Sequence, residues 1–141
     1  MALIWKKEMS VGNDNIDHDH KYLILYVNTV ELCLQTPDQK EQLFDAFAQL
    51  YEYAEKHFTR EESIQRKIGY PESLKHRHIH NSLLKELKDV ELKVSKIKTE
   101  EELKKLAPEM TQFLRSWLID HVFNEDMLLK PYLRKHPRAF S

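Results

Sequence analysis

One stripe of apolar residues, recurring in steps of three and four, constrains this chain more than any other feature. Its members are Leu43, Phe47, Leu50, Ala54, Ile64 and Ile68. This period is that of an α-helix with one buried face. His57 and Glu61 occupy the two places where apolar residues are missing from the stripe. Because a buried carboxylate without partners is costly, other parts of the chain must supply groups that pair with it.

Three further stretches carry stripes of the same period, and each of these stripes includes histidine. Helices are therefore predicted over residues 17–35, over residues 38–67 and from Pro71 onward, with a last helical region that opens at Thr99. Pro108 is expected to kink this last region or to divide it into two helices. The histidines on the four stripes are, in chain order, His20, His57, His76, His80 and His121.

Turn-forming residues are scarce in this chain. Two glycines and five prolines among 141 residues, against 32% charged residues, disfavour a β-protein and favour long helices. Four amphipathic helices with short connections predict an all-α fold, an antiparallel up-down-up-down four-helix bundle. The length suits one domain over residues 1–141, with an N-terminal arm over 1–16 and a short, extended C-terminal tail over 131–141.

Charge and hydropathy argue against several classes of partner. The formal net charge is −1 and basic and acidic residues are interleaved, so neither nucleic acid nor an anionic membrane surface is indicated. The longest apolar run, Tyr22 to Val27, is too short for membrane insertion, and the N-terminus lacks the apolar segment of a signal peptide. A cytoplasmic location is therefore expected. Cys33 is the only cysteine, which excludes an intrachain disulfide and favours a buried, inert thiol.

Five inward histidines and an inward glutamate are more polar groups than a core can satisfy by internal hydrogen bonds. A single histidine on an apolar face is more often an ordinary core residue, but the full set favours a bound metal. Residues four apart stack one turn apart on a helix, so His57 with Glu61, and His76 with His80, can each bind one metal centre. The remaining histidines fall off the stripes and are expected to face solvent: His18, His78 and His136.

The ordered set of ligand-type residues is His20, His57-x3-Glu61, His76-x3-His80 and His121-x4-Asp126. Its context includes Ile16-Asp17, Gly69-Tyr70-Pro71 and Trp117-Leu118, each shortly before one of these histidines. This pattern resembles the hemerythrin family, most closely its single-domain bacterial forms, the bacteriohemerythrins. The likeness runs from Trp5 to about Leu129. One departure is Gln65, where related bacterial sequences often carry methionine.

The resemblance implies a non-heme di-iron centre, in which an oxygen bridge joins two iron ions. One iron would be bound by His76, His80 and His121, and the other by His20 and His57. Glu61 and Asp126 would bridge the two. The iron with two histidines then keeps an open coordination position, which is where the family binds O2. Apolar residues are placed to line a dry O2 pocket beside it: Leu23, Phe58, Trp117 and Leu118.

Helix geometry and the family pattern disagree about the last carboxylate. His121 and Glu125 are four residues apart and would share a face of a regular helix, whereas Asp126 is five residues from His121. The family pattern selects Asp126, which requires a wide turn of the helix near Phe123-Asn124.

Three functions are compatible with such a centre. The first is reversible O2 binding, as a carrier, store, scavenger or delivery protein for an oxygen-using enzyme. The second is a di-iron enzyme that acts on peroxide, nitric oxide or O2, and the third is metal storage, a purely structural site or O2 sensing. Ferritin-like di-iron enzymes typically present Glu-x-x-His pairs and more carboxylates, so the histidine-rich set favours O2 binding without catalysis. Seven ligands also exceed what a tetrahedral zinc site needs.

Overall fold

The structure of the chain, a computed structural model, describes residues 2–36 and 40–136. In these ranges the backbone forms helices and no strand. The long helices are α1 (Asp14–Leu34), α2 (Lys40–Ile68), α3 (Ser73–Ser95) and α4 (Glu100–Arg115). The shorter elements are the 3-10 helix η1 (Lys7–Met9), the π-helix η2 (Ser116–Phe123), α5 (Asn124–Met127) and α6 (Lys130–Arg134).

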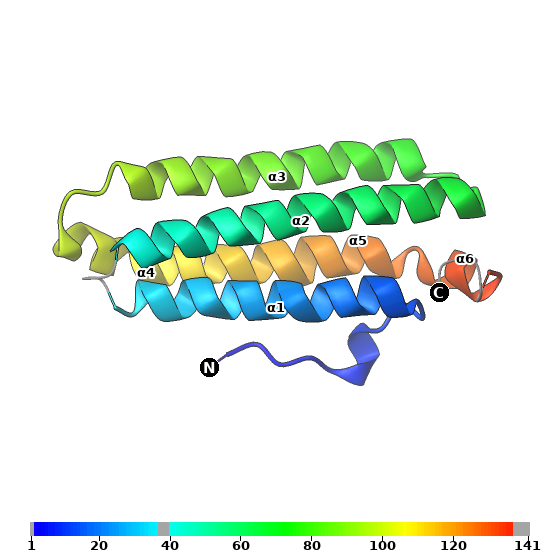
Figure 1. Cartoon of the computed structure of the whole chain (residues 1–141), viewed down its shortest axis with the longest axis horizontal. Coiled ribbons are helices and arrows are strands. Elements are labelled where there is room, and N and C mark those ends of the chain that lie inside the picture. The colour runs from blue at the N-terminus through cyan, green and yellow to red at the C-terminus, as the bar shows by residue number, and fades with distance from the viewer. Residues whose placement is uncertain (1, 37–39, 137–141) are drawn as a thin grey trace.

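The helices form an antiparallel bundle, which confirms the predicted all-α class (Figure 1). α4, η2 and α5 follow one another as a single rod, the fourth of the bundle (Figure 1). α1 packs against α2 and against this fourth rod, and α2 packs against α3. A hydrogen bond from Trp117 Nε1 to the backbone oxygen of Leu83, 3.0 Å long, joins the fourth rod to α3. No helix within the described ranges is long and apolar enough to cross a membrane.

The helix ends follow from local sequence. The Asn13 side chain accepts a hydrogen bond from the backbone N–H of Ile16 at 3.0 Å, so α1 begins at Asp14, three residues before the predicted start. The N-terminal arm is correspondingly shorter than residues 1–16. Gly69 takes a positive φ of 66° just after α2, as the left-handed end of a helix requires. Thr99 caps α4 by accepting a hydrogen bond from the N–H of Glu102 at 3.1 Å, as predicted.

The C-terminal half differs from the sequence prediction at two places. α4 continues through Pro108 and is not divided there. Pro108 and Lys104 are both exposed, so the carbonyl that loses its helical partner can bond to water instead. The tail is not extended from residue 131 onward, because Pro131 takes the first turn of α6, where a missing N–H costs nothing. The rest of the predicted tail, residues 137–141, lies outside the described residues.

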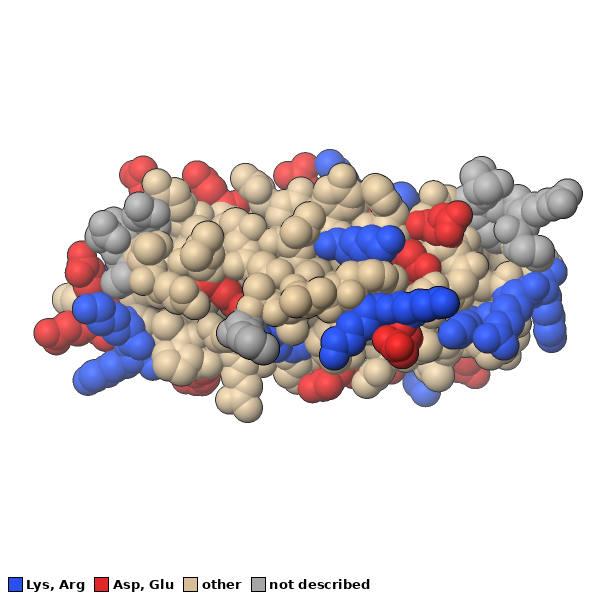
Figure 2. Space-filling model, turned by 90° about the horizontal axis from the view of Figure 1, so that it is seen from below, with Lys and Arg blue, Asp and Glu red and all other residues tan. Residues whose placement is uncertain are grey.

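Charged side chains of both signs are interspersed on the face of the bundle that Figure 2 shows. His18, His78 and His136 are exposed, as expected for histidines that fall off the stripes. Cys33 is half-buried, and burial raises the pKa of its thiol above the usual value. The interleaving of acidic and basic residues in the sequence therefore gives this face a solvated surface of mixed charge.

The core consists of two apolar clusters at different heights of the bundle. The larger cluster extends to the end of the bundle at Leu34 and Ile97, and it includes Leu23, Phe58 and Phe123 nearer the other cluster. The smaller cluster comprises Val11, Ile16, Ile64, Ile68, Tyr70, Leu129 and Leu133. The buried histidines lie at the level where the two clusters meet, as His20 does between Ile16 and Leu23. A buried polar layer therefore crosses the bundle and separates the two clusters.

Candidate metal centre

Six buried side chains of metal-ligand type meet in this polar layer. They are His20, His57, Glu61, His76, His80 and Asp126. Among the described residues they form two groups, and within each group the ligand atoms lie within 4.8 Å of one another. One group contains His20 and His57, and the other contains His76 and His80. Glu61 and Asp126 belong to both groups.

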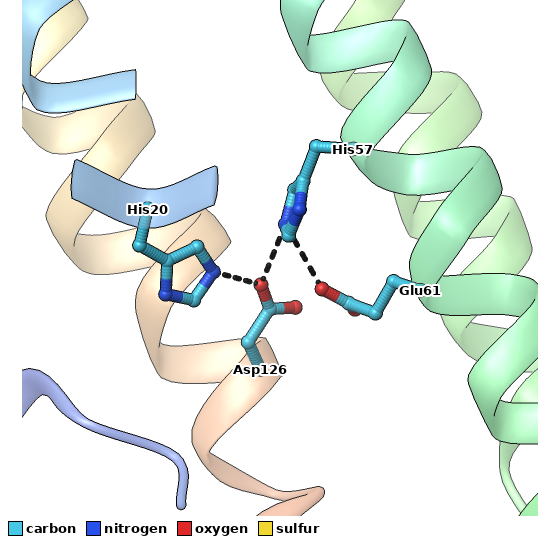
Figure 3. A group of neighbouring side chains, drawn as sticks. All are labelled: His20, His57, Glu61 and Asp126. Carbon is cyan, nitrogen blue, oxygen red and sulfur yellow. Dashed lines mark hydrogen bonds and ion pairs between the residues drawn. The ribbon is translucent and has the colours of Figure 1, made fainter. Parts of the chain in front are cut away.

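In the first group, Asp126 faces both His20 and His57, and Glu61 faces His57 from the other side (Figure 3). Asp126 Oδ2 is 2.6 Å from His20 Nε2 and 3.2 Å from His57 Nε2, while Asp126 Oδ1 is 3.1 Å from His76 Nε2. Glu61 is arranged in the same way: Oε2 lies 2.9 Å from His57 Nε2, and Oε1 lies 2.9 Å from His76 Nε2. Each carboxylate thus presents one oxygen to each group.

The donor atoms of the cluster do not satisfy one another fully. Glu61 Oε2 has no hydrogen-bond partner of suitable geometry in the described part of the chain, although His57 Nε2 is only 2.9 Å away. The same holds for His80 Nε2, at 3.4 Å from Glu61 Oε1. Unpaired polar atoms this deeply buried are rare unless an ion or water completes them. Nitrogen and carboxylate oxygen ligands in two linked groups fit a pair of first-row transition-metal ions.

Pairing between histidines and carboxylates fixes the charges of the cluster. Burial alone would lower the pKa of His76, but hydrogen bonds to Asp126 and Glu61 outweigh it and raise the pKa to about 10. Burial is likewise outweighed at His57, where the Glu61 charge and hydrogen bonds raise the pKa well above 6.5. The histidines in turn hold the pKa values of Glu61 and Asp126 below their ordinary values, although burial would raise them. Near pH 7, protonated His57 and His76 therefore face ionised Glu61 and Asp126 in the metal-free protein.

Metal affinity is expected to rise with pH, because a metal ion and a proton compete for the same ring nitrogen. His57 and His76 stay protonated in the metal-free protein well above pH 6.5, so binding at each of them displaces a proton. For each proton displaced, the affinity for Zn2+ should increase about tenfold per pH unit between about pH 6 and pH 9. Competition with a chelator at several pH values measures this slope. An affinity that stays constant across the range contradicts the prediction.

The shifted pKa values also determine how the stability of the metal-free protein depends on pH. The raised pKa values of His57 and His76 stabilise the fold below about pH 6.5, and this contribution is lost as pH rises toward the folded-state values. The lowered pKa values of Glu61 and Asp126 stabilise it above about pH 4, and this contribution is lost in acid. The cluster therefore stabilises the metal-free fold most between these two limits.

Asp19 supports the cluster from outside, and the sequence interpretation missed it. Its carboxylate accepts hydrogen bonds from His57 Nδ1 at 3.0 Å, from Tyr53 Oη at 2.8 Å, and from Arg60 Nε and Nη2 at 2.9 and 2.7 Å. Burial would raise the pKa of Asp19, but these donors hold it well below 3.8. An ionised partner at Nδ1 fixes the ring of His57 so that Nε2 faces the cluster. Asp19 lies three residues after Ile16 and four before Leu23, so the stripe itself contained the signal.

A π-helical segment, η2, provides the wide turn that the family pattern requires before Asp126. Hydrogen bonds from residue i to i+5 shift the face of every residue that follows the segment. Asp126 is 1% exposed and points into the cluster, whereas Glu125 is only partly buried. The structure thus places Asp126, rather than Glu125, beside the histidines.

His121 is not brought into the cluster. Its side chain is exposed and lines a surface pocket of about 510 Å3, together with His78, Ile79 and Leu83 of α3. η2 ends at Phe123, so only the first part of the interval from His121 to Asp126 has the wide geometry. Residues five apart share a face only while a π turn lasts, which explains why Asp126 faces inward and His121 does not.

All four residues predicted to line an O2 pocket are buried in the larger apolar cluster: Leu23, Phe58, Trp117 and Leu118. Phe58 stacks on His80, with ring centroids 4.0 Å apart, and lies 5.6 Å from the ring of His57. Phe123 stacks on His20 with ring centroids 4.4 Å apart. The sequence interpretation did not include Phe123, because a regular helix would not place it on the same face as His121.

Comparison with known proteins finds relatives over most of the chain. Residues 11–133 match a family model described as the hemerythrin HHE cation binding domain. A bacteriohemerythrin of Clostridium acetobutylicum is 29% identical over 126 residues, which are 87% of this chain and 95% of that protein. One from Stenotrophomonas maltophilia is 23% identical over 139 residues, 99% of this chain and 86% of that protein. A crystal structure of a hemerythrin variant superposes with a TM-score of 0.78 at 24% identity, covering 94% of this chain and 98% of that one.

Proposed function

Because the chain belongs to the hemerythrin family, we propose that its polar layer binds two iron ions and that this pair binds O2 reversibly. The observation that carries the proposal is the placement of Glu61 and Asp126, each with one oxygen facing His57 and the other facing His76. Two carboxylates that face two sets of nitrogen ligands suit a pair of ions better than a single one. The relatives named above as bacteriohemerythrins support the same assignment.

The residues of the polar layer can be assigned to two metal positions. His20 and His57 would hold one ion, His76 and His80 the other, and Glu61 with Asp126 would bridge them. His121 would complete the second set once its side chain turned inward from the surface pocket. A bound pair of iron ions would supply the electrons for reversible O2 binding at this site. Once His121 joined the other set, the side of His20 and His57 would have fewer histidine donors, and O2 would bind there.

Reversibility depends on keeping water and protons away from bound O2. Phe123 covers one face of His20, and Phe58 covers one face of His80. Both rings belong to the apolar cluster that also contains Leu23, Trp117 and Leu118. The indole N–H of Trp117 is already engaged by the Leu83 carbonyl, so it adds no free proton donor to this region. An apolar cover of this kind favours return of O2 over its loss as peroxide.

An O2 titration of the reduced, iron-loaded protein tests the proposed function. We expect two iron ions per chain. A charge-transfer absorption band should form when O2 is added to reduced protein that has been kept anaerobic until then. The band should disappear when O2 is removed, and the cycle should repeat. Prompt, irreversible oxidation with one peroxide released per chain would identify a di-iron oxidase instead. Failure to take up iron would overturn the metal assignment itself.

A further inference from the structure

A buried amide lies against one of the two shared carboxylates. Gln65 follows Glu61 by four residues on α2, so its side chain lies one turn further along the same inward face. The Gln65 side chain is completely buried. Its Nε2 donates a hydrogen bond of 3.4 Å to Glu61 Oε1. This direction is the stable one, since the reverse orientation of the amide would place an oxygen against the carboxylate.

The hydrogen bond from Gln65 reaches only one side of the Glu61 bridge. Glu61 Oε1 is the oxygen that faces His76 at 2.9 Å and His80 at 3.4 Å. The other oxygen, Oε2, faces His57. Gln65 therefore acts on the metal position next to His76 and His80, on the opposite side of the bridge from the position next to His20 and His57.

The backbone of Gln65 is anchored at the end of α2. Its backbone oxygen accepts a hydrogen bond of 2.9 Å from the N–H of Tyr70, in the turn that ends α2. Its side-chain Oε1 has no hydrogen-bond partner within the described residues. The side chain lines a cavity of about 120 Å3 whose outer walls include Glu62, Arg66 and Arg77. A cavity of this size has room for water, which would satisfy Oε1 while Nε2 remains on Glu61.

We propose that Gln65 sets how readily the metal pair is oxidised, by drawing charge from the Glu61 carboxylate. The inference rests on the proposed di-iron centre and deepens it. A hydrogen bond to a ligand oxygen weakens the electron donation of that oxygen to its metal, and a weaker donor favours the lower oxidation state. Burial strengthens the effect, because the hydrogen bond acts through a region of low dielectric constant. Gln65 thus keeps the iron near His76 and His80 ferrous, the state that O2 binding requires.

The test is the midpoint potential of the iron-loaded protein with Gln65→Met, which keeps the length of the side chain and removes the donor. At equal iron content, the ferrous–ferric equilibrium should shift toward ferric by about threefold to tenfold. A tenfold shift corresponds to about 59 mV for one electron passed to the electrode. Ile68→Met is the matched control: it places the same side chain one turn away, in the smaller apolar cluster, and should leave the potential unchanged.

A second measurement separates an electronic role from a merely structural one. Zn2+ affinity reports whether the site is still assembled, without any change in oxidation state. Full iron loading with an unchanged potential in Gln65→Met and in Gln65→Leu overturns the proposal. So does a loss of Zn2+ affinity and iron without a lower potential, because Gln65 would then only position Glu61. If the wild-type protein loads iron but binds no O2, the proposed function fails while the shift in potential can still be measured. If it takes up no metal pair, both fail.

Discussion

Asp126→Ala is expected to abolish binding of the metal pair, whereas Glu125→Ala should leave it intact. Asp126 Oδ2 lies 2.6 Å from His20 Nε2 and Oδ1 lies 3.1 Å from His76 Nε2, so its loss removes an oxygen from both groups at once. Loss of even an outer-shell partner typically lowers metal affinity 10–100-fold, so loss of a shared ligand should lower it by more than about 100-fold. Iron content per chain and Zn2+ affinity measure the effect.

The two variants are a matched pair, because they remove a carboxylate from neighbouring residues of α5. Glu125 is only partly buried, and its removal should change stability by no more than about 0.5 kcal/mol. The comparison tests whether the π turn of η2 determines which of the two carboxylates, Glu125 or Asp126, binds the metal. Full loading in Asp126→Ala together with loss of metal in Glu125→Ala would mean that the fourth rod keeps regular helical geometry in the loaded protein.

Removing the metal is expected to lower the melting temperature substantially, and Glu61→Ala should eliminate this difference. A ligand present at about 1,000 times its dissociation constant stabilises a folded protein by about 4 kcal/mol. For a chain of this size, that amounts to a shift on the order of 10 °C. Glu61 contributes to both groups, so its loss should leave the melting temperature the same with and without Zn2+.

Glu55→Ala provides the control for this second comparison. Glu55 is exposed on the same helix, so removing it should leave the metal-dependent shift intact. The melting temperatures of the metal-free wild-type protein and metal-free Glu61→Ala should be compared first. The charge of Glu61 helps to keep His57 protonated in the absence of metal, so its loss also changes the metal-free protein. A metal-dependent shift that persists in Glu61→Ala would show that one metal position survives without the bridge, and would contradict a shared site.

The apolar period was sufficient to predict the bundle and most of the polar layer. Stripes with steps of three and four mark the inward faces of regular helices, and His20, His57, His76 and His80 lie on those faces. Spacings of four residues also place Glu61 beside His57 on α2. These predictions succeeded because α1, α2 and α3 are regular helices over the whole layer.

The fourth rod could not be predicted in the same way. A periodic argument assumes a constant angle between successive residues, and η2 changes that angle between Ser116 and Phe123. The position of Asp126 came from the family pattern, and neither source predicted that His121 would be exposed. The inward stacking of Phe123 on His20 was missed for the same reason. Asp19 was missed because Asp19 and His20 both fit the helical step before Leu23, and only His20 was assigned to the stripe.

The polar layer that separates the two apolar clusters has a consequence for how the molecule opens. The smaller cluster gathers Val11 from the N-terminal arm and Leu133 from near the other end of the chain. Without metal, the layer joins this end to the larger cluster through histidine–carboxylate contacts, and such a region can open at less than the cost of global unfolding. Bonds from four helices to shared ions would remove that weak boundary. Iron loading would therefore decide whether the protein unfolds as one cooperative unit or as two.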